Sequence, residues 1–331
     1  MRTSKKVIMK KGIVLDIGDS PILSSCPSYS YKTLLLQNAG REATNIFLAN
    51  HFTNCIYEPH FFDLYEEDYY FEKEELFSLH CFEVYTSNVI PNYSRIAFQI
   101  ANYLTDGYYA IAHWNLLYLP QSTCYETKHN DIEHIIYGID FEKNEMCIIS
   151  GSFGEMQKYA VSFDCYFSSK LVFNAKKVVF TFVRLNDLKD ISIDITKIKN
   201  DLDDFLSSRS RFYLQSPDWR KYGLKAIDSL IRKLSGCDNT TFIEMLQSVD
   251  VFCDHIISMY ITIQMLAKRN RIYMRFLSRF YPVFSDTTHL RKICRDSSLY
   301  NSGDFRDEVL NLINQIRYEE EKIIRNLINS L

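Results

Sequence analysis

The strongest constraint on the fold is a change in sequence pattern near residue 200. Before it, short apolar runs alternate with polar turns, whereas from about Lys199 the segments carry apolar residues at helical spacing. The chain has 331 residues, enough for one large domain or two of ordinary size. We therefore predict an α+β domain over residues 1–205, followed by an all-helical domain over residues 206–331.

Two helices and several strands are predicted in the first domain. The helices are expected over 28–40 and 92–107, each ending at a glycine. The apolar runs HIIYGID and MCIIS flank the polar stretch FEKNE, which predicts a β-hairpin. Further strands are expected over 108–120, 158–169, 176–185 and 191–198. The acidic run over 63–75 indicates a solvated face or a loop rather than a site.

Composition and charge exclude several classes of protein. The net charge is −3 and no basic block stands out, which argues against a nucleic-acid partner. No apolar stretch approaches the roughly 20 residues of a membrane span, so no membrane partner is expected. The basic N-terminus loses its apolar run at Asp16, too early for a signal peptide. We expect a cytoplasmic protein.

The nine cysteines are widely spaced and include no Cys-x-x-Cys pair, which predicts thiols rather than disulfides. Most are expected to be buried structural thiols. Cys26 differs because it lies between Ser25 and Pro27, at the start of the helix predicted over 28–40. The unpaired amides of a helix start lower the pKa of a thiol and favour the thiolate. Cys26 is thus either a nucleophile or an ordinary buried thiol.

Cysteine catalysis also needs a histidine that moves the proton and a polar group that orients the imidazole. His134 begins the first strand of the predicted hairpin, and a hairpin through FEKNE brings its partner position near Gly151. Ser150 is therefore the candidate orienting residue, where an Asp or Asn is the usual choice. Asp140 lies six strand positions from His134, roughly 20 Å away at about 3.3 Å per residue, and is too far to orient the ring.

Other polar and aromatic residues near His134 have weaker interpretations. Cys124, His129 and His134 form a Cys-x4-His-x4-His run, but no second close pair supplies the remaining ligands of a zinc site, so no metal is predicted. His129 is expected in a loop at the mouth of a pocket. Trp114 is expected in the core or in the pocket wall, and the expected substrate-binding residues are Tyr118, His129 and Trp114.

Short motifs also recur in a fixed order over most of the chain. In chain order they are Cys26, Leu34-Leu35 and Gly40; Gly107 and Tyr118-Leu119-Pro120; His134, Gly138 and Asp140; and Tyr222-Gly223 with Ala226. In this order the chain resembles the butirosin-biosynthesis acyltransferase family, a papain-like cysteine fold related to double-glycine leader peptidases. It also resembles the peptidase-like amide synthases of polythioamide biosynthesis. Two positions depart from the pattern: Ser25 replaces a His, and the Asp after the hairpin is missing.

The resemblance implies a papain-like cysteine peptidase/acyltransferase fold, with Cys26 on the N-terminal helix and His134 on an antiparallel sheet. It implies transfer of an acyl group from a carrier-protein thioester to an amine, in nonribosomal-type natural-product biosynthesis. Cys26 would form the acyl-enzyme, and His134 would act as general base and then acid. The Cys26 amide would form part of an oxyanion hole. The partners would be an acyl or peptidyl carrier protein with its phosphopantetheine arm and an amine acceptor, with no cofactor.

Two alternatives use the same residues differently. A cysteine peptidase or amidase needs the same Cys and His, and a binding protein that retained the fold without catalysis explains the missing Asp.

Acyl transfer from a thioester needs no nucleotide, because the thioester already stores the free energy of amide formation. In agreement, the sequence contains neither of the nucleotide-binding motifs GxxxxGK[ST] and GxGxxG. The closing run RYEEEKIIRNLINSL predicts a solvated amphipathic helix, with a homodimer contact or carrier docking as alternatives.

Overall fold

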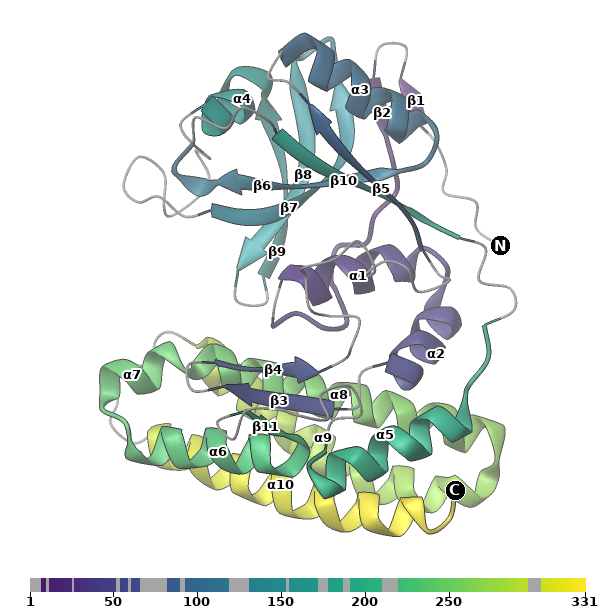
Figure 1. The fold of residues 1–331 in the computed structure, drawn as a ribbon, viewed down its shortest axis with the longest axis vertical. Helices are drawn as coiled ribbons and strands as arrows, with labels where there is room; N and C mark the ends of the chain where they lie inside the picture. The colour runs from purple at the N-terminus through teal and green to yellow at the C-terminus, as the bar shows by residue number, and fades with distance from the viewer. Residues whose placement is uncertain are drawn as a thin grey trace. The chain divides into compact units, whose positions relative to one another are not determined.

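The computed structural model describes residues 7–9, 12–25, 27–51, 54–58, 61–65, 82–89, 93–118, 131–152, 155–171, 178–186, 191–209, 220–296 and 305–331. The chain forms two compact units (Figure 1). The first comprises Met1–Arg41 and Phe71–Lys189, and the second comprises Glu42–Tyr70 and Asp190–Leu331. Each unit therefore combines two separate stretches of the chain, in contrast to the single predicted boundary near residue 205.

The first unit is built on an antiparallel sheet. Its strands are β1 (Val7–Met9), β2 (Gly12–Val14), β5 (Phe82–Val89), β6 (Tyr109–Asn115), β7 (Asp131–Asp140), β8 (Glu145–Ser152), β9 (Glu155–Ser162) and β10 (Val178–Leu185). They pair in the order β1-β2-β7-β6-β10-β5, with β8 on β7 and β9 on β8. The predicted hairpin is confirmed, because β7 and β8 pair across the turn at 141–144.

Helices of the first unit are α1 (Pro27–Gln37), α3 (Tyr93–Thr105) and α4 (Phe163–Leu171), with a 3-10 helix, η3 (Leu116–Tyr118). Residues 30–36 of α1 are buried in succession, so this helix lies inside the unit instead of presenting one face to water. Both predicted helices are confirmed. They end shortly before Gly40 and Gly107, which have φ of 102° and 86°.

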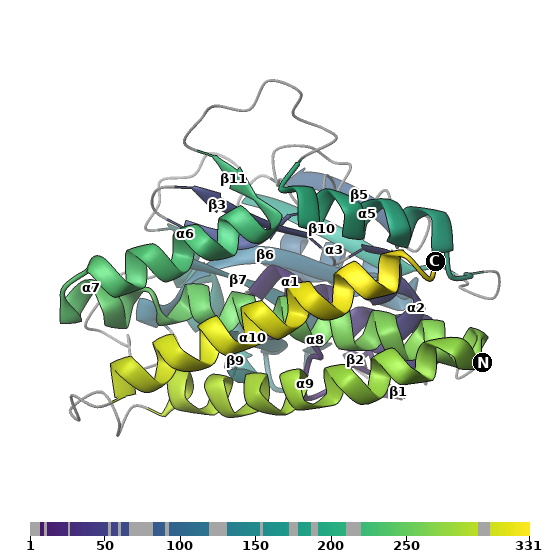
Figure 2. The ribbon, with the colours of Figure 1, turned by 90° about the horizontal axis from the view of Figure 1, so that it is seen from below.

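The second unit contains most of the helices. Its elements are α2 (Arg41–His51), β3 (Asn54–Glu58), β4 (Phe61–Tyr65), α5 (Ile195–Ser207), β11 (Lys221–Tyr222), α6 (Gly223–Gly236), α7 (Asn239–Glu244), α8 (Leu246–Arg269), η4 (Arg271–Tyr273), α9 (Met274–Arg295) and α10 (Phe305–Ile328). Figure 2 shows α10 between α6 and α9. The α+β class and the helical C-terminal region are thus as predicted.

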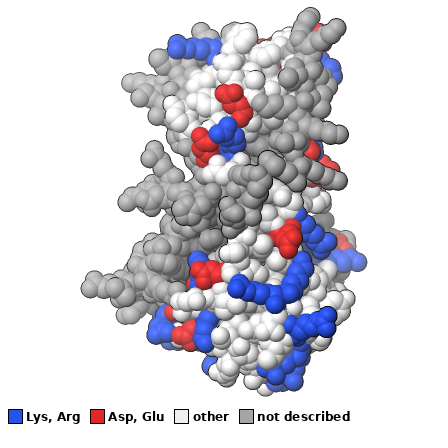
Figure 3. Space-filling model, turned by 90° about the vertical axis from the view of Figure 1, so that its right-hand side faces the viewer, with Lys and Arg blue, Asp and Glu red and all other residues white. Residues whose placement is uncertain are grey.

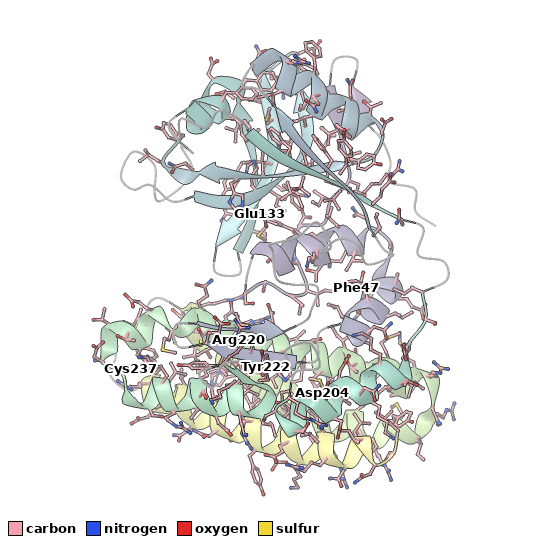
Figure 4. All side chains as sticks on the ribbon, viewed as in Figure 1. Phe47, Glu133, Asp204, Arg220, Tyr222 and Cys237 are labelled. Carbon is pink, nitrogen blue, oxygen red and sulfur yellow. The ribbon has the colours of Figure 1, made fainter. Side chains whose placement is uncertain are left out.

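The β3–β4 hairpin belongs to the helical unit although it precedes most of the large sheet in sequence. Tyr222 of β11 pairs with Ile56 of β3, and the Phe62 ring lies 6.5 Å from that of Phe252 on α8. Next to Tyr222, Arg220 makes an ion pair with Glu58 at 2.5 Å (Figure 4). These non-local contacts join the early hairpin to the C-terminal helices.

Three predicted strands are instead helical over part of their length. In the segment 108–120, β6 ends at Asn115 and the 3-10 helix η3 follows. In the segment 158–169, β9 ends at Ser162 and α4 follows; in the segment 191–198, α5 begins at Ile195. In the last two segments the cause is N-capping. The Ser162 hydroxyl accepts a hydrogen bond from the Cys165 amide at 3.2 Å, and the Asp194 carboxylate accepts one from the Lys197 amide at 2.8 Å. A cap satisfies an otherwise unpaired helix amide, which outweighs a short apolar alternation.

The Tyr222-Gly223 pair forms a close joint between α5 and α6. Gly223 has φ of 54°, and a Cβ at this position would lie 2.1 Å from the Phe205 carbonyl oxygen. The Ser208 hydroxyl, just after α5, accepts a hydrogen bond from the Lys225 amide of α6 at 3.1 Å. Only glycine fits this approach without displacing the backbone.

The stretch Asn239–Arg269 is long and apolar enough to cross a membrane by length and composition alone. The most apolar part of this stretch is nevertheless largely buried inside the protein, which is typical of a core helix. Two carboxylates of α8, those of Asp250 and Asp254, are also buried, and both pair with Arg291 of α9. Helix α8 therefore forms the centre of the helical unit.

Candidate functional site

His134 lies on β7, opposite Ala112 of β6, and is fully buried. Its Nε2 atom is 2.9 Å from the hydroxyl oxygen of Tyr166 on α4. The two rings meet edge to face, with centroids 5.4 Å apart and an angle of 74° between the ring planes. Tyr166 is itself fully buried. The imidazole is thus held by a hydrogen bond and by packing against the same side chain.

Burial raises the pKa of Tyr166 far above its ordinary value, so the side chain remains a neutral phenol. The phenol oxygen can accept a hydrogen bond from Nε2 when this nitrogen carries a proton. When Nε2 carries no proton, the phenol hydroxyl can donate the hydrogen bond instead. When Nε2 carries the proton and donates to Tyr166, Nδ1 is the nitrogen that can accept a proton from a reacting group. Tyr166 can therefore set the ring orientation and tautomer, but it supplies no negative charge to stabilise an imidazolium.

Ser150 lies on β8 next to His134. The pairs Ile135↔Ile149 and Ile136↔Ile148, continued by one position, put Ser150 opposite His134. This lies within the range predicted near Gly151. A β-bulge between Ile136 and Gly138 shifts the register, so that Ser150 rather than Gly151 is the direct partner. Ser150 is buried, and within the described part of the chain its hydroxyl has no hydrogen-bond partner.

Helix α1 is tied to the strand position next to His134. The Tyr31 hydroxyl of α1 donates a hydrogen bond to the backbone carbonyl of Glu133. The helix begins at Pro27, one residue before the predicted range, and Ser25 on the other side of Cys26 is buried. Cys26 itself lies outside the described residues.

Glu133 is a second ionisable group at this position (Figure 4). Burial raises the pKa of its carboxyl to about 7, and the nearby charge of Lys32 partly opposes that increase. Lys32 is buried on α1. Glu133 precedes His134 in the strand, so their side chains point to opposite faces of the sheet. Close to neutral pH, Glu133 is thus a mixture of protonated and ionised forms.

Two of the predicted substrate-binding residues, Tyr118 and Trp114, lie in the described part of the chain. Tyr118 ends η3, and its backbone carbonyl accepts a hydrogen bond from the Cys165 thiol of α4, next to Tyr166. Trp114 lies on β6, where its backbone pairs with Ile132 of β7. His129, like Cys124, lies outside the described residues.

Tyr166 and Glu133 were not predicted from the sequence. The apolar spacing of 158–169 predicts a strand through Tyr166, but Ser162 caps a helix there. The sequence predicts that the strand begins at His134, which leaves Glu133 outside it, whereas β7 starts at Asp131. The signals that could have identified them are the serine three residues before Cys165 and the apolar-polar alternation that continues back to Asp131.

The site therefore combines a buried imidazole, a neutral phenol and a buried serine within one sheet and the helix against it. Among the residues that the structure describes, no group of three or more His, Cys, Asp or Glu side chains is arranged to hold a metal ion. The chain matches no protein-family model and no curated protein.

Proposed function

We propose that the protein is a cysteine-dependent acyltransferase of papain-like fold that forms an amide through an acyl-Cys26 intermediate. The main support is the link between the helix that begins immediately after Cys26 and the strand that carries His134. Tyr31, one turn into α1, bonds the backbone of the residue that precedes His134. A papain-like site requires this pairing of a helix start with a strand.

In the first step, the Cys26 thiolate attacks the carbonyl carbon of a thioester. The tetrahedral intermediate collapses by breaking the carbon–sulfur bond, and the departing thiolate takes the proton that His134 has received from Cys26. In the second step, an amine attacks the acyl-Cys26, His134 accepts the amine proton, and Cys26 leaves as a thiolate. The net reaction converts a thioester and an amine into an amide and a thiol.

Tyr166 takes the orienting role in this proposal. Its hydroxyl accepts a hydrogen bond from the Nε2–H group of His134, so Nδ1 is the nitrogen that exchanges protons with Cys26 and the amine. Because the phenol is neutral, the imidazolium that forms during each step is stabilised less than it would be by a carboxylate. Ser150 lies opposite His134 on the adjacent strand, where papain-like sites use a carboxylate or amide, and is the second candidate for the orienting role.

The acyl donor would be carried on the phosphopantetheine arm of an acyl or peptidyl carrier protein, and the acceptor would be a small amine in natural-product biosynthesis. Tyr118, Trp114 and His129 are proposed to contact these substrates. The thioester supplies the free energy, so the reaction requires no nucleotide. Such chemistry suits a cytoplasmic enzyme.

Intact-protein mass spectrometry tests the proposal directly. The wild type, Cys26→Ala and Cys165→Ala are each mixed with simple acyl thioesters. Cys165 is a matched control because it lies near the site but its pKa is raised by burial, which makes it a poor nucleophile. We expect the mass of one acyl group on the wild type and on Cys165→Ala, and none on Cys26→Ala. Addition of an amine should remove the acyl group and yield the amide.

Failure to form an adduct with any thioester, or an equal adduct on Cys26→Ala, would reject the acyltransferase. That result would support a binding protein that retained the fold, an alternative favoured by the complete burial of His134 and by Ser150 in place of a carboxylate. If the acyl-enzyme forms but is discharged by water and not by amines, and the wild type cleaves peptides, the protein is a peptidase or amidase.

A further inference from the structure

Five exposed cationic side chains gather where α8 turns into α9. They are Lys268, Arg269, Arg271, Arg275 and Arg279, and they are called here the basic corner. No acidic residue occurs in the sequence between Asp254 and Asp286. In Figure 3, blue side chains gather on the lower part of the face shown, where few red ones lie among them. A protein with a net charge of −3 thus presents a locally positive surface.

The charges of the basic corner are not neutralised within the described part of the chain. Arg269 donates to the Ile193 carbonyl at 2.9 Å, and Arg275 donates to the Ser330 hydroxyl at 2.9 Å. Both acceptors are uncharged, so they position the guanidinium groups and leave their charge available. Near the other end of α9, by contrast, Arg291 is paired with buried carboxylates.

The basic corner also carries apolar side chains. Ile272 and Met274 are 53% and 48% exposed, and they are the large aliphatic side chains left exposed among the described residues. They lie between Arg271 and Arg275, two of three arginines spaced four residues apart. A surface that combines unpaired cations with exposed aliphatic groups is typical of a docking site for another molecule.

We propose that the basic corner, with Ile272 and Met274, docks an acidic protein surface. A nucleic acid would contact the cations through phosphates but offers little to the two aliphatic side chains. A lipid surface requires a broad apolar face, whereas the apolar side chains of α9, such as Phe276 and Phe280, are buried in the unit. A protein surface on which acidic residues surround an apolar contact would match both the cations and the two aliphatic side chains.

This partner is identified as the carrier protein, an assignment that rests on the proposed function. Attraction between opposite charges would accelerate the encounter, and the aliphatic contacts would slow dissociation. The sequence alone does not indicate this surface, because apolar residues separate Arg275 and Arg279 from the cations at 268, 269 and 271, and the five gather only when η4 and α9 fold.

The test measures binding of the full chain to a panel of acidic acyl carrier proteins, each phosphopantetheinylated and acylated. Arg271→Glu/Arg275→Glu/Arg279→Glu is compared with the wild type. The matched control, Lys225→Glu/Arg232→Glu/Lys233→Glu, makes the same change in charge at exposed cations of α6. We expect Kd to rise roughly tenfold or more in the first variant only. The Kd of the wild type should also rise with salt.

A second variant, Ile272→Ser/Met274→Ser, separates a protein partner from a polyanion. It should weaken carrier binding without changing net charge. Equal binding by the wild type and the Arg271→Glu triple variant, or equal losses in that variant and the α6 control, would overturn the proposal. So would binding of RNA or phosphatidylserine vesicles, instead of the carriers, that depends on the basic corner.

The proposed function and the docking surface fail in distinguishable ways. A small soluble thioester should acylate the Arg271→Glu triple variant as fast as the wild type, whereas a carrier-bound thioester should acylate it more slowly. Normal acylation by both donors refutes the docking surface and leaves the acyltransferase intact. Carrier binding that depends on the basic corner, with no acyl-enzyme from any donor, refutes the acyltransferase and supports the docking surface.

Discussion

Tyr166→Phe removes one hydroxyl group and leaves the ring that packs against His134. The hydrogen bond that is lost measures 2.9 Å and joins two fully buried side chains, so water cannot replace it without rearrangement. A buried polar atom that loses its partner costs about 1–3 kcal/mol. No cavity larger than the hydroxyl is created, so the free energy of unfolding should fall by an amount in this range and the protein should remain folded.

The same free energy should appear in the rate of acylation. Without the phenol oxygen, nothing at Tyr166 favours the tautomer of His134 that carries its proton on Nε2. If about 1–3 kcal/mol of stabilisation is lost in the transition state, the rate of acyl-enzyme formation falls by a factor of about 5 to 150. General base catalysis by His134 is expected to increase the rate by a factor of about 10²–10⁴. The variant should therefore retain part of the activity.

Quenched-flow mass spectrometry with a small thioester measures that rate, and urea unfolding measures the stability of the same variants. Tyr109→Phe is the matched control, because the Tyr109 hydroxyl is also buried and bonded, to the Asp16 carbonyl and the Asn38 amide. Both variants should lose stability, but only Tyr166→Phe should lose rate. Equal acylation rates for the two variants would refute an orienting role for Tyr166.

Three further predictions concern stability. Gly223→Ala should lower the free energy of unfolding by about 2–4 kcal/mol, because its Cβ would lie 2.1 Å from the Phe205 carbonyl oxygen at a φ of 54°; an unchanged urea midpoint would contradict this. Burial raises the pKa of Glu133 from 4.5 to about 7, so the native state binds more protons than the unfolded state between those values. The free energy of unfolding should therefore fall by about 3 kcal/mol as pH rises through this window, and Glu133→Gln should abolish that fall. The same pH dependence of unfolding in both proteins would exclude a raised pKa of Glu133. Arg291→Leu should cost about 3–5 kcal/mol, because it removes the guanidinium that pairs with the buried carboxylates of Asp250 and Asp254; urea unfolding that shows a loss typical of a surface substitution would argue against the pairing.

The elements around Cys26 and His134 were predictable because their signals are local. Pro27 fits the first turn of a helix, Gly40 follows its end, and a polar turn joins the two strands of the hairpin. Tyr166 was not predictable in the same way. Its helix starts through a hydrogen bond to Ser162, in a segment whose apolar spacing also fits a strand. A capping interaction decided between two patterns of similar strength.

Non-local contacts account for the other differences between sequence and structure. The β3–β4 hairpin lies in the helical unit because Tyr222, far along the chain, pairs with Ile56. This pairing has no local signature, because it depends on which distant segments meet. The cations from Lys268 to Arg279 are close in sequence but form no continuous block, and the turn through η4 brings them to one surface.

The β-bulge at Tyr137 determines whether His134 or Glu133 shares a face of the sheet with Ser150. A uniform register from the hairpin turn would align Ile135 with Ser150, and alternation would then place Glu133 on the same face. The extra residue shifts the ladder by one position and brings His134 to that face instead. Because His134 and Glu133 are consecutive, one additional backbone unit selects the proton-transfer chemistry available at this position.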